Sequence, residues 1–181
     1  EAGVRAELAA LRAAPAPAEP QALAFLGHSL GCAAATQLAA RLTSRRPAWL
    51  GGTVPAARLV LSAPFTSMKD MGQVLFGEVP GASFVLAAVA RMSRHNWDNA
   101  SNLQRLAFAT ADRPLSVTIL HGRMDEIVPV QMGRQLFSMC KGLGLDCRWV
   151  ERAAAGHNDI LDEAFAEFAQ AIIDGALPGK L

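Results

Sequence analysis

The sequence predicts an α/β fold with a doubly wound, mostly parallel β-sheet, and three observations lead to this class. Short apolar runs alternate with longer helix-forming stretches along nearly the whole chain. The run at residues 116–120 is β-branched and apolar throughout, which is typical of a parallel strand buried on both faces. The chain has 181 residues, 51% of them hydrophobic, which is enough apolar material for one sizeable core. We therefore expect a single domain spanning residues 1–181.

Each predicted element follows from its local pattern. Residues 1–14 predict an amphipathic helix, because Val4, Leu8 and Leu11 recur at a spacing of three or four. A Pro- and Ala-rich connection follows at residues 14–20, before the first apolar run. The predicted strands are residues 22–26, 58–62, 116–120 and 146–151, and the predicted helices are residues 32–42, 130–141 and 160–176. This order implies right-handed crossovers between parallel strands.

The turn between the first strand and the first helix carries the main chemical signal. Its sequence, at residues 27–31, is Gly-His-Ser-Leu-Gly. A serine bounded by glycines between a strand and a helix is typical of a nucleophile elbow, in which Ser29 Oγ stands clear of the sheet. We expect side chains at Gly27 and Gly31 to collide as the helix folds back on the strand. The backbone N–H of Leu30 would then face a developing oxyanion. The alternative is a glycine-bounded turn with a surface serine.

An acid and a base for this serine follow the last two strands. Asp125 comes just after the strand at residues 116–120, with Glu126 as a weaker alternative. His157 follows Gly156 in the loop before the last helix. The carboxyl ends of parallel strands meet at one edge of the sheet, so these side chains are expected near Ser29. The predicted catalytic residues are therefore Ser29, Asp125 and His157, with the Leu30 N–H as an oxyanion donor.

The other three histidines are weaker candidates for the base. His28 adjoins the serine, but a side chain next to the nucleophile is expected to project elsewhere. His121 is expected to cap its strand or to hydrogen-bond locally in the turn that presents Asp125. His95 lies in a polar stretch and is expected to face solvent. For His157 itself, the alternative is a loop histidine bonded to a carbonyl.

Three blocks, residues 27–31, 120–129 and 156–159, resemble the carboxyl-terminal two-thirds of an α/β-hydrolase-fold serine hydrolase. Short strings at residues 62–68, 97–99 and 156–159 are similar to a eukaryotic subgroup of membrane-associated α/β-hydrolase-domain proteins, some of which are protein depalmitoylases. The resemblance implies hydrolysis of a carboxylic ester or thioester through an acyl-enzyme, on a lipid-like acyl substrate or an acylated protein. It also implies that amino-terminal strands, a second oxyanion donor and any membrane anchor lie upstream of this sequence.

Two other functions remain open. A peptidase of the prolyl-oligopeptidase type would share the fold and the order serine, acid, histidine, although it usually carries a glycine where this chain has Cys32. A non-catalytic binding or scaffold member of the fold is the other alternative, and such proteins typically lose one of the three residues. Comparing an amide substrate with the matching ester would separate the peptidase from the esterase.

The stretch between the second and third strands is too long for a simple crossover. We interpret residues 65–113 as a helical cap insertion over the active site, and its apolar, methionine-containing composition would suit an acyl chain. The alternative is that these side chains only pack the insertion onto the sheet. Trp97 and Asp98 are expected to be a packing anchor and a loop hydrogen-bonding residue.

Composition narrows the function classes further. The formal net charge of +1 gives no reason to expect nucleic acid as a partner. No apolar run is long enough to span a membrane. The three cysteines have neither metal-ligand nor disulfide-framework spacing, so we expect free thiols, no metal and no cofactor. Reduced thiols favour an intracellular or membrane-associated protein.

Overall fold

The computed structural model describes residues 23–45, 57–76, 97–110 and 115–173. The described strands are β1 (Leu23–His28), β2 (Ala57–Ser62), β3 (Leu115–Gly122) and β4 (Asp146–Arg152). They form a four-stranded sheet in the order β1-β2-β3-β4, and every pairing is parallel. The predicted parallel α/β sheet is confirmed, and each predicted strand is found.

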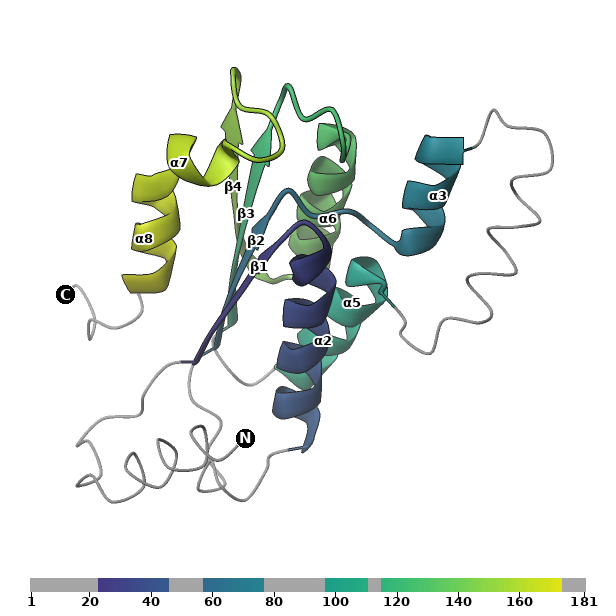
Figure 1. Cartoon of the computed structure of the whole chain (residues 1–181). Helices are drawn as coiled ribbons and strands as arrows, with labels where there is room; N and C mark the ends of the chain where they lie inside the picture. The colour runs from purple at the N-terminus through teal and green to yellow at the C-terminus, as the bar shows by residue number, and fades with distance from the viewer. Residues whose placement is uncertain (1–22, 46–56, 77–96, 111–114, 174–181) are drawn as a thin grey trace, which may run out of the picture.

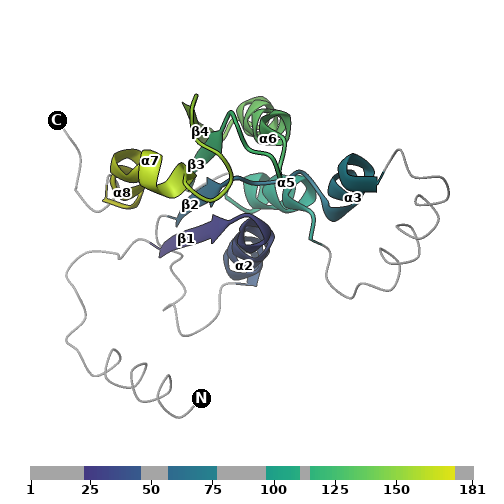
Figure 2. The same cartoon turned by 45° about the horizontal axis from the view of Figure 1, so that its top comes forward.

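Helices cover both faces of this sheet, so the doubly wound arrangement is also confirmed (Figures 1 and 2). Three long helices lie on one face, and two shorter ones lie on the other. The first group is α2 (Leu30–Arg45), α5 (Asn99–Ala109) and α6 (Val130–Gly142); the second is α7 (Ile160–Glu163) and α8 (Phe165–Ile173). A further helix, α3 (Met68–Phe76), lies beyond the carboxyl ends of the strands on the side of the first group.

The predicted helix at residues 160–176 is divided in two. Ala164, which is fully buried, ends α7 with φ −118° and ψ 25°. It packs with Val60, Leu120 and Ile160 in the apolar layer between the sheet and these helices. The chain therefore turns at Ala164, where a small side chain packs against the sheet. The prediction of one uninterrupted helix is wrong.

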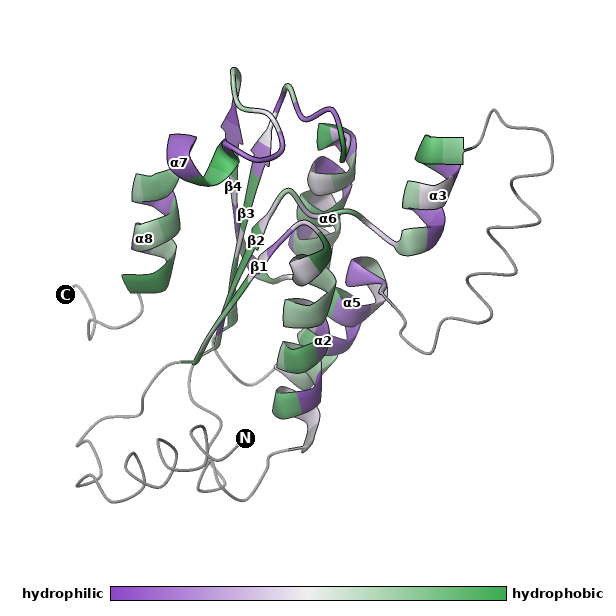
Figure 3. Cartoon of the chain, in the orientation of Figure 1, coloured by the Kyte–Doolittle hydropathy of each residue, from purple (hydrophilic) through white to green (hydrophobic). Residues whose placement is uncertain are grey.

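The sheet is buried most completely in its middle. All six residues of β2 are buried, as are seven of the eight in β3. Strands buried on both faces have little room for polar side chains, and Figure 3 shows apolar colours along the strands with hydrophilic ones in the loops after β3 and β4. The polar side chains capable of chemistry are therefore concentrated at the carboxyl ends of the strands.

Part of the predicted cap can be placed. Its last helix, α5, packs beside α2 in the helical layer, as a crossover helix leading to β3. An isolated antiparallel bridge joins Ser67, the residue before α3, to Asp98, the residue before α5. Residues 77–96 lie outside the described residues, as does the predicted helix at residues 1–14. A cap over the active site thus remains a prediction.

Candidate active site

Ser29 occupies a strained turn between β1 and α2. Its φ is +53°, in the left-handed region that most residues avoid. Its backbone N–H donates to the Ser62 carbonyl at 2.8 Å, and its own carbonyl accepts from Cys32 N at 3.0 Å. These two bonds hold the turn between the end of β2 and the first turn of α2, which is the strand-turn-helix geometry expected of a nucleophile elbow.

The two glycines that flank the serine are not equivalent. A Cβ at Gly27 would lie 2.6 Å from both Cys32 Cα and the Gly31 carbonyl oxygen, so glycine is needed there. At Gly31, a Cβ would meet nothing within 4 Å in the described part of the chain outside the backbone of its own helix. The expected collision is thus confirmed at Gly27 and is wrong at Gly31, because Gly31 already lies on a helix face with no described neighbour.

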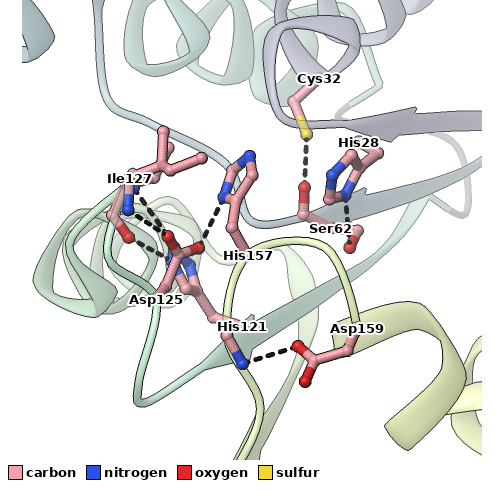
Figure 4. A network of polar contacts seen from close by, with 10 residues as sticks. His28, Cys32, Ser62, His121, Asp125, Ile127, His157 and Asp159 are labelled. Carbon is pink, nitrogen blue, oxygen red and sulfur yellow. Dashed lines mark hydrogen bonds and ion pairs between the residues drawn. The ribbon is translucent and has the colours of Figure 1, made fainter.

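Asp125 and His157 are joined directly. His157 Nδ1 lies 2.8 Å from Asp125 Oδ2, and the two side chains are 5% and 0% exposed (Figure 4). Because a carboxylate can only accept, Nδ1 carries the hydrogen, and in the neutral ring Nε2 keeps a lone pair. A histidine in this state is prepared to take a proton from a nucleophile. Glu126, the weaker candidate for the acid, is exposed.

Backbone contacts between two loops bring the acid and the base together. Arg123 N donates to the Arg152 carbonyl at 2.9 Å, and Met124 N donates to the Ala155 carbonyl at 3.0 Å. The loops approach so closely at Gly122 that a Cβ there would lie 2.2 Å from Ala155 O. The loop after β4 is thereby held against the loop after β3, which sets His157 beside Asp125.

The Asp125 carboxylate is surrounded by donors. Its Oδ1 accepts the backbone N–H groups of Ile127 at 2.9 Å and Val128 at 2.8 Å. Burial alone would raise the pKa of Asp125, but hydrogen bonds from His121, from His157 and from these two backbone groups lower it to about 2. Asp125 is therefore ionised at neutral pH, as the partner of a catalytic histidine must be.

His157 lies next to the elbow, against the ring of His28. The ring centroids of His28 and His157 are 5.0 Å apart (Figure 4). Within the described residues, no hydrogen bond joins the Ser29 hydroxyl to His157. Because Ser29 directly follows His28, the three predicted catalytic residues share one region at the carboxyl ends of β1, β3 and β4. The complete triad and the role of the Leu30 N–H remain predictions.

His28 is a site neighbour that sequence reasoning misplaced. Its side chain does not project elsewhere but packs on His157, and its Nδ1 lies 3.1 Å from Ser62 Oγ. Burial, and next the charge of His157, lower the pKa of His28, while the charge of Asp125 raises it. His28 is the last residue of β1 and pairs with Ser62 of β2, which places its ring beside the Ser62 hydroxyl.

Residues 62–68 and 97–99, two of the segments that carry the subgroup resemblance, are joined by hydrogen bonds. Asn99 Nδ2 donates to the Phe65 carbonyl, and Asn99 Oδ1 accepts from the Thr36 hydroxyl, both at 2.8 Å. Asp98 caps α5 through Ser101 N at 2.8 Å. Trp97 packs against an apolar cluster that includes Phe65. The expected roles of Asp98 as a hydrogen-bonding residue and of Trp97 as a packing anchor are confirmed.

Other site types have no support in the described residues. No group of three or more metal-ligating side chains occurs among them. Cys32, Cys140 and Cys147 are all buried free thiols, and burial raises the pKa of Cys32 to about 12. None of the described helices combines the length and the apolar character needed to cross a membrane. His95 lies outside the described residues.

Comparisons with known proteins bear on the fold. A Pyrococcus horikoshii acylaminoacyl peptidase superposes on 99% of this chain with a TM-score of 0.57 at 10% identity, over 28% of its own length. A Pyrococcus furiosus esterase superposes on 96% of this chain with a TM-score of 0.52 at 16% identity, over 60% of its length. The chain has the α/β-hydrolase fold. The resemblance seen in the sequence is confirmed at this level.

The sequence relatives match only part of this chain. No protein-family model matches the chain. The lysophosphatidylserine lipase ABHD12 of Bos taurus is 29% identical over 118 residues, which are 62% of this chain and 26% of the relative. The chain thus spans about a quarter of the length of this curated relative.

Proposed function

We propose that this α/β-hydrolase chain carries the catalytic residues of a serine hydrolase that cleaves carboxylic esters or thioesters of lipid-like acyl substrates. The observation that supports it most is the 2.8 Å hydrogen bond between Asp125 and the buried His157, beside the strained turn at Ser29. A buried carboxylate–histidine pair next to a serine with φ of +53° is hard to explain by packing alone.

The proposed reaction begins with attack of Ser29 Oγ on the acyl carbonyl carbon. His157 Nε2 takes the hydroxyl proton, and Asp125 stabilises the imidazolium that forms. The Leu30 N–H, at the start of α2, donates to the tetrahedral oxyanion. Collapse breaks the ester or thioester bond as His157 returns the proton to the leaving oxygen or sulfur. Water, activated by the same histidine, then releases the acid and restores Ser29.

The proposed substrate class has two supports. The curated relative at 29% identity is named as a lysophosphatidylserine lipase, which places a lipid ester among the substrates of a similar protein. Large apolar side chains are also exposed on both sides of the site. Leu30 follows the serine, and Met124 and Ile127 flank the acid, with exposed fractions of 44%, 65% and 43%. An acyl chain would cover such a rim.

Active-site labelling tests the proposal directly. The full-length natural protein is treated with a fluorophosphonate probe, and the adduct is located by mass spectrometry. We expect labelling at Ser29 that is lost in Ser29→Ala and His157→Ala, while Ser44→Ala, a serine bonded to the Ala40 carbonyl within α2, labels normally. A folded protein that does not label at Ser29 would instead favour the non-catalytic binding member of the fold.

A matched substrate series tests the bond that is cleaved. The assay compares an ester, a thioester and an amide with the same acyl group, together with a lysophospholipid. We expect hydrolysis of the oxygen or sulfur esters and at least a hundredfold slower cleavage of the amide. Equal rates on the amide would contradict the esterase proposal and favour the peptidase. Acylated proteins as substrates, and membrane association, are further proposals for the natural protein.

A further inference from the structure

A second histidine, His121, contacts the same carboxylate oxygen of the acid as the base does. It belongs to β3 and is completely buried. Its Nε2 lies 2.9 Å from the Val128 carbonyl oxygen and 3.4 Å from Asp125 Oδ2. Both of these neighbours can only accept hydrogen bonds, since Asp125 is ionised at neutral pH. The ring therefore carries its hydrogen on Nε2, where it donates to the Val128 carbonyl and also faces the carboxylate at the longer distance.

The other ring nitrogen accounts for the orientation of the ring. His121 Nδ1 is buried and has no hydrogen-bond partner among the described residues. It faces α6 at Gly133, where a Cβ would lie 2.4 Å from Nδ1. The Trp149 ring lies beside it, with ring centroids 6.2 Å apart. Leaving a buried polar atom without a partner costs free energy. In the orientation that leaves Nδ1 without a partner, the other ring nitrogen, Nε2, faces Asp125.

The contacts of Asp125 indicate what His121 contributes. Oδ1 is fixed by the backbone N–H groups of Ile127 and Val128. Oδ2, the oxygen that accepts from His157, also faces His121 Nε2 at 3.4 Å. Rotation of the carboxyl group would break contacts at both oxygens together. His121 thus restrains the oxygen on which the orientation of His157 depends.

We propose that His121 is a positioning residue of this active site, which holds Asp125 Oδ2 in line with the Nδ1–H group of His157. The proposal rests on the proposed function, since it assigns a catalytic purpose to the Asp125–His157 pair. His121 touches neither Ser29 nor the substrate, and it acts only through the acid.

Two substitutions separate positioning from simple packing. His121→Leu removes the N–H donor and places an apolar side chain in the same buried position. His121→Gln retains an N–H donor at about the distance of Nε2 from the backbone. We expect kcat on an ester to fall about tenfold to a hundredfold in the leucine variant with little change in KM, and to recover substantially in the glutamine variant. Thr118→Val, in the same strand, controls for a polar-to-apolar change within β3.

A spectroscopic measurement makes the test independent of turnover. The hydrogen between His157 Nδ1 and Asp125 gives a downfield proton NMR signal, which we expect to move or broaden in His121→Leu and to be restored in His121→Gln. If labelling and turnover fail in the natural protein while this signal still depends on His121, the proposed function fails and the positioning role stands. An unmoved signal with kcat like that of the natural protein in the leucine variant would overturn the positioning role.

The natural protein offers one more measurement, which is needed if the leucine variant does not fold. The ¹⁵N chemical shifts of the His121 ring report which nitrogen carries the hydrogen. We expect the Nε2–H form at neutral pH. Finding the hydrogen on Nδ1 would overturn the proposal, because Nε2 could then donate to neither Val128 nor Asp125.

Discussion

Asp125→Asn is the substitution from which the site geometry predicts the largest change for the smallest alteration in shape. The two backbone donors at Oδ1 require an acceptor there, so the asparagine oxygen must occupy that position. Its NH₂ group then faces the ring nitrogens of His157 and His121, where Oδ2 now accepts. Two donors cannot face each other, so His157 must carry its hydrogen on Nε2. In that form it cannot take the proton of Ser29.

The expected loss follows from this change of tautomer. With geometry retained and the base in the wrong protonation form, kcat falls by roughly 10⁴-fold. Steady-state hydrolysis of a chromogenic ester measures this loss, and circular dichroism confirms that the variant is folded. Glu126→Gln is the matched control, since it makes the same carboxylate-to-amide change at the neighbouring exposed residue. A folded Asp125→Asn protein with more than a tenth of the natural kcat would refute the assignment of Asp125 as the acid.

Three further predictions concern stability and titration. Gly27→Ala should destabilise the protein by about 1–3 kcal/mol or more in urea unfolding, because its Cβ would lie 2.6 Å from backbone atoms, whereas Gly31→Ala should not. The pKa of Asp125 falls from 3.8 to about 2 on folding, so its contribution of about 2 kcal/mol is complete above about pH 4 and is lost as the pH falls toward 2. In Asp125→Ala, the free energy of unfolding should not show this loss between about pH 4 and pH 2. The NMR titration midpoint of His28 should lie below 6.5 and should rise in His157→Ala; a midpoint at or above 6.5 would contradict the burial of its ring.

The sequence predicted the elements of the site well for a topological reason. Ser29, Asp125 and His157 each follow a strand of one parallel sheet, and such strands end at a common edge. Strand periodicity and chain order were therefore enough to predict that these residues lie at one edge of the sheet. Contacts between side chains from different loops and strands were beyond that reasoning, and His28 is the clearest example. It pairs with Ser62 of β2 at the end of β1, and its ring there meets His157 from the loop after β4, which the sequence pattern does not reveal.

The acid is held mainly by contacts within its own loop, whereas the base reaches it through contacts between distant parts of the chain. Three of the donors around Asp125 come from residues 121–128, so this loop specifies the position and ionisation of the acid almost by itself. The fourth donor, His157, arrives from 32 positions further along. It depends on the register of β3 with β4, which pairs Gly122 with Arg152, and on the close approach that Gly122 permits to Ala155. A one-residue change in that register would leave the acid intact and remove the base from it. The sequence motif around Asp125 is therefore informative on its own, whereas the function proposed for His157 depends on the whole sheet.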